Sequence, residues 1–330
     1  GIALSELARP EEALEAFESA IEIDPQYVNA WYNKACILDQ LARPEEALAS
    51  YEKAVKLYDS HALAWTNKGI VLGKLGRYEE ALDALERAME INSRHAGNWA
   101  NKGIALYELN KLKDALEAFS RAIEVNPGLS TDIWYNQAFL LNEIDRYEEA
   151  LESYDRAIEM EPRHADAWYD KSMVLDKLSK PTEALNAFEK AIELNPRRAD
   201  AWYNKGIVLS KLEKYKDAIK SFEQATELDS SHAGSWYNRG IALYKLSRNK
   251  EALVSYEKAI ELNPLHTGAW YNKGIVLNEL ARNQEALESF EEAIEQDPNH
   301  SDSWYNKGVV LYKLNRYKEA LDAYENAIEI

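Results

Sequence analysis

The sequence predicts an all-α protein, a solenoid of about ten stacked helix–turn–helix units of 34 residues each. Two observations support this prediction. The nine tryptophans recur every 34 residues, with a single step of 35. Small residues, leucines and alanines keep fixed distances from each tryptophan. Because a fixed period of a few tens of residues is typical of stacked-repeat architectures, residues 1–330 are predicted to form a single solenoid domain.

The tryptophans define the register of the repeat. They are Trp31, Trp65, Trp99, Trp134, Trp168, Trp202, Trp236, Trp270 and Trp304. The one-residue insertion falls in the loop 128–132, shortly before Trp134. Four residues after each Trp comes Gly, Ala or Ser, which predicts close packing there, and seven residues after it comes Leu. Alanine occupies the positions sixteen and twenty-three after Trp in every unit.

Each helix of the unit follows from these columns. The first helix carries Trp, the small residue and Leu on one face, and mostly Tyr and Ile on a second stripe. A helix that is apolar on nearly all sides is expected to lie between other helices. A short break such as Leu75-Gly76-Arg77 ends it. The second helix, for example residues 45–58, has one apolar stripe and an acidic outer surface, and a proline follows it in most units.

The composition disfavours several classes of function. The net charge is −18, which opposes binding to nucleic-acid phosphates or to an anionic membrane surface. No apolar run is long enough to span a bilayer. The single cysteine, Cys36, cannot form an intrachain disulfide and is typical of a reducing compartment. We therefore expect a soluble, cytoplasmic protein with neither nucleic-acid nor membrane partners.

The 34-residue unit, with Trp-x-x-x-Gly-x-x-Leu followed by Ala, an aromatic residue, Ala and Pro, resembles the tetratricopeptide repeat over the whole chain. The resemblance implies a right-handed superhelix and a scaffold that binds a peptide segment of a partner protein in a concave groove. Units that read Trp-Tyr-Asn-Lys-Gly look prokaryotic, more often archaeal. One column departs from the family pattern, because Lys or Arg stands three residues after Trp in eight units and Gln137 in the ninth. The pentatricopeptide RNA readers are the nearest alternative, but the tryptophan pattern and the net acidity fit them poorly.

The two ends of the chain predict a piece of a longer array. Gly1-Ile2-Ala3-Leu4 matches the middle of a first helix whose Trp is missing, and Ile330 ends a second helix without a polar cap. Solenoids need polar caps to stay soluble. We therefore expect the first unit to be truncated, and we expect end-to-end self-association through the two uncapped ends.

The candidate binding residues lie in the only polar arc of the first helix. Asparagine stands two residues after Trp in eight of nine units, although it is a poor residue for a helix interior. In tetratricopeptide repeat proteins this column faces the groove, and a similar asparagine ladder in O-linked N-acetylglucosamine transferase holds peptide backbone. An amide can pair with peptide bonds without reading a sequence. The predicted peptide-binding residues are Asn33, Asn67, Asn101, Asn136, Asp170, Asn204, Asn238, Asn272 and Asn306, together with Tyr169, Tyr203, Tyr237, Tyr271 and Tyr305.

The same columns leave alternatives open. The asparagines can instead join neighbouring repeats by hydrogen bonds, and the tyrosines can be packing residues. The six histidines, each four residues before a Trp, are too far apart to share a metal and are expected to be polar residues at helix starts. No catalytic motif is present, so neither an enzyme, a cofactor nor a metal is predicted. The alternative functions are a substrate-presenting or regulatory arm of a larger enzyme and a self-assembling structural rod.

Overall fold

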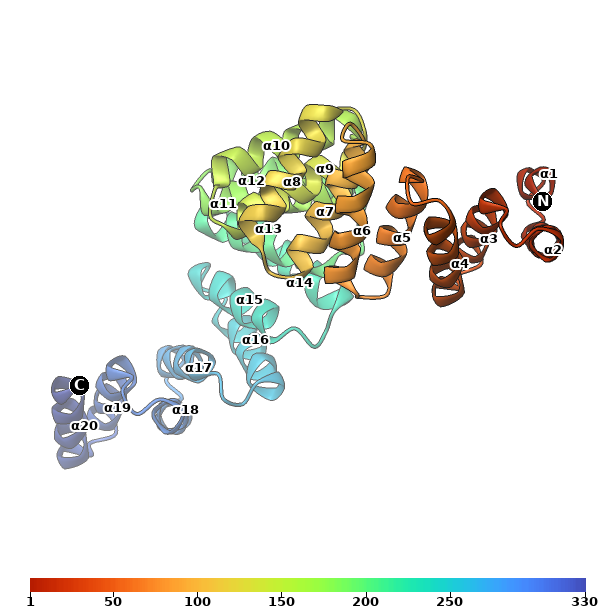
Figure 1. The fold of residues 1–330 in the computed structure, drawn as a ribbon. Helices are drawn as coiled ribbons and strands as arrows, with labels where there is room; N and C mark the ends of the chain where they lie inside the picture. Colours follow the sequence, from red (N-terminus) through yellow and green to blue (C-terminus); the bar gives the residue numbers. More distant parts are fainter. The chain divides into compact units, whose positions relative to one another are not determined.

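The computed structural model describes residues 1–330, which form two compact units, Gly1–Pro162 and Arg163–Ile330. Every regular element is an α-helix, and the helices follow one another as pairs joined by short turns (Figure 1). This arrangement confirms the predicted all-α architecture of stacked helix–turn–helix repeats. The two units are described separately, and their union in one continuous solenoid stays a prediction.

Apart from α1, which has only five residues, the helices have nearly constant lengths. Those of the first unit are α1 (Ile2–Glu6), α2 (Pro10–Ile23), α3 (Val28–Gln40), α4 (Pro44–Leu57), α5 (Ala62–Lys74), α6 (Tyr78–Ile91), α7 (Ala96–Glu108), α8 (Leu112–Val125), α9 (Thr131–Glu143) and α10 (Tyr147–Met160). Those of the second unit are α11 (Ala165–Lys177), α12 (Pro181–Leu194), α13 (Ala199–Lys211), α14 (Tyr215–Leu228), α15 (Ala233–Lys245), α16 (Asn249–Leu262), α17 (Thr267–Glu279), α18 (Asn283–Gln296), α19 (Ser301–Lys313) and α20 (Tyr317–Glu329). Odd-numbered helices are the first helices of the repeats, and even-numbered helices are the second helices.

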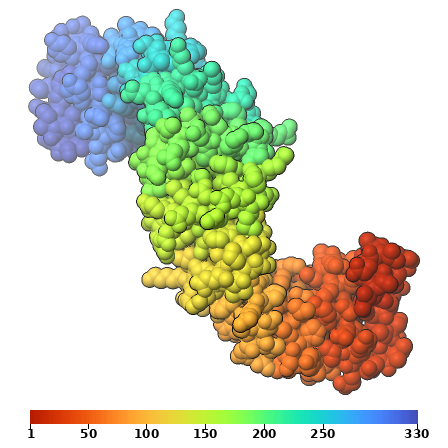
Figure 2. Space-filling model, turned by 90° about the horizontal axis from the view of Figure 1, so that it is seen from above, coloured from red at the N-terminus to blue at the C-terminus, as the bar shows by residue number.

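Within each unit, every first helix except α1 and α11 lies between two second helices, as its apolar surface predicts. For example, α13 packs on α12 before it and on α14 after it, and it also touches the neighbouring first helices α11 and α15. No second helix packs closely on another second helix. Within each unit the repeats follow one another in sequence order (Figure 2). The repeats therefore approach each other most closely on the side of the first helices, and we call the exposed surface of these helices the groove face.

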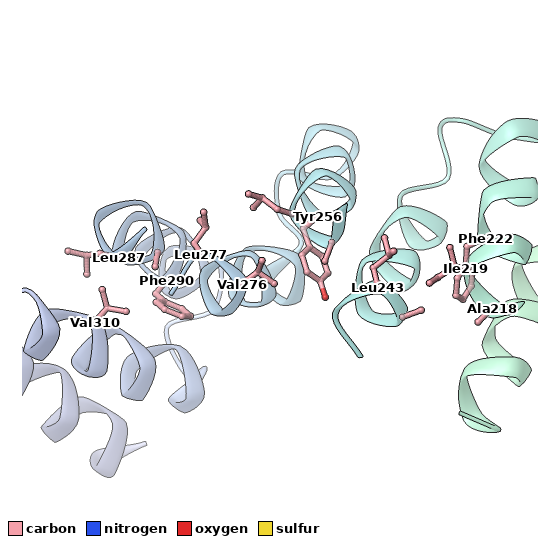
Figure 3. Packing of buried hydrophobic residues seen from close by; sticks show 14 of the residues in the cluster. Ala218, Ile219, Phe222, Leu243, Tyr256, Val276, Leu277, Leu287, Phe290 and Val310 are labelled. Carbon is pink, nitrogen blue, oxygen red and sulfur yellow. The ribbon is translucent and has the colours of Figure 1, made fainter. Parts of the chain in front are cut away.

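The apolar core of the second unit runs continuously from repeat to repeat. Phe222, Tyr256 and Phe290 each project from a second helix and are almost completely buried (Figure 3). The first and second helices of a repeat approach each other most closely at the glycine four residues after Trp. A Cβ atom at Gly240 would lie only 2.6 Å from Cε1 of Tyr256. This distance is shorter than a van der Waals contact, which explains the small residues of this column.

The turn between the two helices of a repeat is a Schellman motif. After α3, the N–H of Arg43 donates to the carbonyl of Leu38 at 2.9 Å, and the N–H of Ala42 donates to that of Asp39 at 3.0 Å. Ala42 has a φ of 54°, in the left-handed region. Ten turns contain such a residue, and Gly76 is the only glycine among them. The connection between α8 and α9 spans residues 126–130 and is one residue longer than the other connections between repeats.

Candidate functional site

All predicted binding residues lie on first helices. The asparagine column and Asp170 are half-buried, as are Tyr169, Tyr203, Tyr237 and Tyr271. Tyr305 is 56% exposed. The side chains of the two columns are neighbours in sequence, so they leave each helix in adjacent directions. The question for function is therefore which of their polar atoms the protein itself uses.

Most of the asparagines donate a hydrogen bond to a tyrosine of the preceding repeat. The Nδ2 atom of Asn204 lies 3.0 Å from the hydroxyl oxygen of Tyr169. The same bond joins Asn67 to Tyr32 at 3.2 Å, Asn238 to Tyr203 at 3.3 Å, Asn272 to Tyr237 at 3.2 Å and Asn306 to Tyr271 at 3.3 Å. The column thus joins neighbouring repeats, which is the alternative role that the sequence left open for it.

The bond forms where the preceding repeat carries a tyrosine one residue after its Trp. Thr66 and Ala100 occupy this position in the repeats before Asn101 and Asn136. Asn101 donates instead to the backbone carbonyl of Gly97 at 2.8 Å. The amide of Asn136 makes no hydrogen bond within the protein and lines a pocket. Asn136 is therefore a member of the column whose donor and acceptor are both available.

The side-chain oxygens of the bonded asparagines remain available. Asn238, for example, donates from Nδ2 to Tyr203 at 3.3 Å and to the carbonyl of Gly234 at 2.9 Å. No group of the protein donates to its Oδ1 atom, or to those of Asn204 and Asn272. Since an amide oxygen only accepts, this part of the column can receive N–H groups from a ligand but has few donors to offer.

The tyrosines are packing residues as well as hydrogen-bond acceptors. The ring of Tyr203 lies 6.1 Å from that of Phe222 in its own repeat and 4.6 Å from that of His232 in the next. Beside Tyr169 the next repeat carries Arg198 at the histidine position, and its guanidinium lies 3.6 Å from the centre of the tyrosine ring. Burial raises the pKa of Tyr203, and it is the main cause that raises the pKa of Tyr169 to about 12. These hydroxyls are consequently neutral donors and acceptors rather than acid–base groups.

The histidines begin the first helices, as the sequence predicts. Nδ1 of His266 accepts the backbone N–H of Ala269 at 3.1 Å, which caps α17. The equivalent cap is made by His61, His164, His232 and His300. His95 starts α7 without this bond. No group of three His, Cys, Asp or Glu side chains lies close enough together to hold a metal ion.

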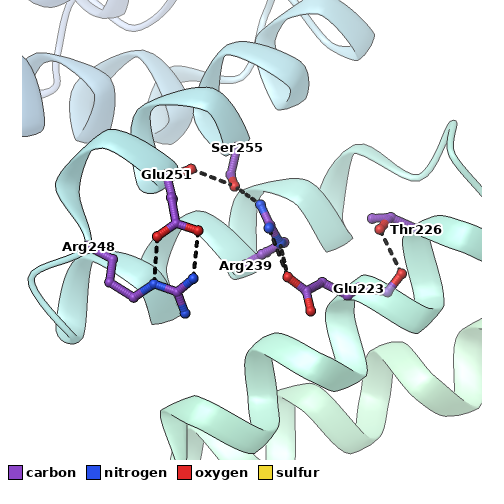
Figure 4. A network of polar contacts seen from close by, with 6 residues as sticks. All are labelled: Glu223, Thr226, Arg239, Arg248, Glu251 and Ser255. Carbon is purple, nitrogen blue, oxygen red and sulfur yellow. Dashed lines mark hydrogen bonds and ion pairs between the residues drawn. The ribbon is translucent and has the colours of Figure 1, made fainter.

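The basic residue three after Trp, which departs from the family pattern, links second helices of adjacent repeats. Arg239 donates to Glu223 on α14 at 2.9 and 3.2 Å and to Ser255 on α16 at 2.6 Å (Figure 4). Its guanidinium also lies 5.9 Å from the ring centre of Trp236. In other repeats a lysine pairs with the preceding second helix, as Lys205 does with Glu189 of α12 at 3.2 Å. Sequence reasoning missed this role, although the acidic residue sixteen positions earlier is a visible signal.

Sequence reasoning also missed a pocket on the groove face of the first unit. It has a volume of about 330 Å³. Its walls are Ile104, Tyr107 and Glu108 of α7, Phe119 of α8, and Tyr135, Asn136 and Phe139 of α9. The signal that points to it is the interruption of the tyrosine column at Ala100.

None of the helices combines the length and the apolar character needed to cross a bilayer.

Comparison with solved structures finds related arrays of repeats. YrrB, described as a TPR protein with an unusual peptide-binding site, is 28% identical, with a TM-score of 0.54 over 58% of this chain and 98% of YrrB. The C-terminal part of a TPR repeat-containing protein from Cytophaga hutchinsonii is 16% identical, with a TM-score of 0.64 over 73% of this chain and 98% of its own. MamA is 20% identical, with a TM-score of 0.50 over 51% of this chain and 92% of its own. The last two similarities concern the fold alone.

Comparison with curated proteins gives no match. Five family models, each described as tetratricopeptide repeat, match successive parts of the sequence. The matched segments are 1–27, 16–49, 62–95, 99–129, 131–164, 165–198, 199–232, 237–300 and 271–330. These segments together cover most of the sequence, and the chain belongs to the tetratricopeptide repeat family.

Proposed function

We propose that this protein is a scaffold that binds an extended peptide segment of a partner protein along the groove face. The observation that carries the proposal is the row of asparagine Oδ1 atoms that receive no hydrogen bond from the protein, for example on Asn204, Asn238 and Asn272. Each lies on a half-buried helix beside a tyrosine ring. Such a row can accept backbone N–H groups from a ligand of almost any sequence.

The spacing of the row favours a particular ligand conformation. In the second unit the first helices of adjacent repeats touch, so their axes are expected to lie about 8–10 Å apart. A polyproline II segment has three residues per turn and rises about 3.1 Å per residue, so every third residue returns to the same side after about 9 Å. One N–H per turn can therefore meet one asparagine per repeat. The tyrosine rings beside the asparagines would pack against the side chains of the ligand.

Two further observations support a protein partner. The net charge of −18 opposes a nucleic-acid ligand. YrrB, whose description names a peptide-binding site, is 28% identical to this chain and is matched over 98% of its length. The matched family models include no catalytic family. We accordingly propose a non-enzymatic, cytoplasmic scaffold, with selectivity set by side chains around the row.

The experiment separates the two uses of each asparagine. Peptides that bind the full-length chain are selected from a phage-displayed library of random twelve-residue sequences, and their dissociation constants are measured by fluorescence anisotropy. The test variant replaces Asn204, Asn238 and Asn272 with Ala and removes both donors and acceptors. We expect binding to weaken about tenfold or more, because each lost hydrogen bond contributes about 0.5–1.5 kcal/mol and about 1.4 kcal/mol corresponds to a factor of ten.

The matched control breaks the same three bonds between repeats from the other side. Replacing Tyr169, Tyr203 and Tyr237 with Phe removes the hydroxyls to which these asparagines donate, but it keeps every Oδ1 atom. We expect this variant to lose stability and to keep most of its affinity. Equal loss of affinity in both variants, or none in the asparagine variant, would show that the column is structural only. Methylation of a backbone nitrogen of the peptide should weaken binding at every third residue, where the N–H meets an asparagine, and less at the residues between.

A further inference from the structure

The groove face of the first unit has an opening where the tyrosine column is interrupted. Ala100 stands on α7 where most first helices carry a tyrosine, and the following asparagine, Asn136, has no phenol to donate to. Beside Asn136 lies the pocket of about 330 Å³ described above. One turn after Ala100, Ile104 is 43% exposed, whereas Ile207 and Ile275 at the equivalent position are half-buried.

The pocket has the size and lining of a site for one apolar side chain. Five of its seven lining residues are apolar or aromatic, and the rings of Tyr107 and Phe139 meet edge to face with centres 6.1 Å apart. An apolar cavity of about 150 Å³ is large enough to hold a benzene molecule. A pocket of about 330 Å³ therefore has room for a leucine or a phenylalanine side chain.

Asn136 gives this pocket a polar anchor that the bonded asparagines of the column lack. In those asparagines Nδ2 donates to a tyrosine hydroxyl or, in Asn101, to a backbone carbonyl. At Asn136 both Nδ2 and Oδ1 are available, so the amide can donate to the C=O and accept the N–H of the residue whose side chain enters the pocket. Paired bonds of this kind fix the position of one residue of the ligand.

The charge at the rim identifies the flanking residues of that ligand. Glu108 lines the pocket, and Glu143 lies one helical turn after Phe139 on α9. Both carboxylates are exposed and neither forms an ion pair within the protein. Lys102, the nearby cation of α7, pairs instead with Glu86 at 2.7 Å. Two unpaired carboxylates, one in the pocket wall and one a helical turn away, are complementary to Lys or Arg on either side of an apolar residue.

We infer that this pocket binds one leucine-sized or aromatic side chain of a partner segment that carries Lys or Arg beside it, with Asn136 holding the backbone of that residue. The inference rests on the proposed function because it uses the same groove face. The pocket would fix the register of the bound segment and select its side chains, whereas the row of asparagine Oδ1 atoms accepts many sequences. The pocket lies wholly within the unit Gly1–Pro162.

The test uses the full-length chain and three fluorescein-labelled nonapeptides built on Gly and Ser. The first carries a central Leu between two lysines, the second a central Ser between two lysines, and the third a central Leu between two glutamates. Fluorescence anisotropy should show that the first binds at least tenfold more tightly than either of the others. Raising the salt concentration should weaken the first peptide, because exposed charges are screened.

Variants then locate the binding. Ala100→Tyr restores the tyrosine column, so its phenol should fill the opening, bond Asn136 and weaken the first peptide at least tenfold. The double variant Glu108→Gln with Glu143→Gln should weaken it severalfold and remove most of its salt dependence. Ile104→Ser, at an exposed position, supplies a second probe of the pocket wall in case Ala100→Tyr does not fold. Circular dichroism and urea unfolding check the fold of each variant.

The outcomes separate this inference from the proposed function. The inference about the pocket is overturned if the first two peptides bind equally, or if the first peptide binds well-folded Ala100→Tyr and Ile104→Ser as tightly as it binds the parent. The groove proposal still stands in that case if library peptides bind more weakly to the Asn204, Asn238 and Asn272 variant. Conversely, a response of the first peptide to Ala100→Tyr supports the pocket even if no peptide responds to that triple variant. In that case the row of asparagines is structural and the pocket alone binds.

Discussion

Replacing Gly240 with Leu should destabilise the second unit through overlap with Tyr256. The first added atom, Cβ, would lie 2.6 Å from Cε1 and 2.8 Å from Cδ1 of that ring. The ring has little space into which it can move, because Tyr256 is only 1% exposed and packs 6.1 Å from the ring of Tyr237. The remaining three carbons of the leucine would enter the same filled space.

The magnitude follows from two opposing effects. Overpacking a well-filled core costs about 1–3 kcal/mol, and the contact distance at Gly240 places this site at the upper end. Removing a glycine from a helix interior returns about 1 kcal/mol, since leucine is the better helix former. The net loss in the free energy of unfolding is therefore about 2 kcal/mol. Gly240→Ala adds the same Cβ atom, so the ring of Tyr256 must still shift, but no further carbons enter the core and the gain in helix propensity offsets part of the cost. The loss should therefore be smaller than for leucine, in keeping with Ala35, which occupies the same column opposite Tyr51.

Urea unfolding followed by circular dichroism measures the effect as a lower midpoint. Because repeats can unfold in groups, the comparison uses the shift of each transition rather than one global fit. The control is Gly73→Ala, since a Cβ atom at Gly73 meets no atom within 4 Å. That substitution should raise stability by about 0.5–1 kcal/mol. A midpoint for Gly240→Leu equal to that of the parent would refute the packing argument.

Three further predictions concern hydrogen bonds and protons. Tyr203→Phe removes the acceptor of Asn238 and should cost about 0.5–1.5 kcal/mol in urea unfolding, whereas an unchanged midpoint would mean that the bond between repeats contributes nothing. His266→Ala removes the cap of α17 and should lower the free energy of unfolding by about 1 kcal/mol, which His266→Asn should largely recover. If the Asn variant is as unstable as the Ala variant, loss of the cap is not the cause of the destabilisation. Stability should fall as the pH rises from about 10 to about 12, because the pKa of Tyr32 and Tyr169 is raised to about 12 in the folded chain while unfolded tyrosine releases its proton near 10. Unfolding at a series of pH values, with tyrosinate absorbance as the readout, checks this, and constant stability over that range would contradict it.

The helical repeat could be predicted because its signals are local and recur. The Trp, Leu and Ala columns mark the buried faces, and the histidine before six of the first helices is a recognisable cap position. The left-handed turn residue was not predictable from its type, because the chain uses Ala, Ser or Glu213 there as readily as Gly76. In this turn the Schellman hydrogen bonds, rather than glycine, determine the conformation.

The position of the asparagine column in the fold could be predicted, but the hydrogen bonds of its amides could not. The asparagine column was located correctly on the first helices, yet the sequence left open whether its amides serve a ligand or the next repeat. The structure shows Nδ2 of Asn204 bonded to Tyr169, a contact that depends on how two helices are stacked. The pocket was missed for a related reason. It depends on the absence of one ring, at Ala100, and a missing side chain leaves only an irregularity in a repeating pattern.

The contacts that join one repeat to the next also determine how the chain can fold. The bond between Asn204 and Tyr169 spans 35 residues, and the ion pair between Lys205 and Glu189 spans only 16. Proteins with such short sequence separations between contacting residues fold quickly, because little chain entropy is lost before each contact forms. Folding can start at any neighbouring pair of repeats and spread in both directions. A nascent chain can consequently acquire structure repeat by repeat while it is being synthesised, before its last residues have been added.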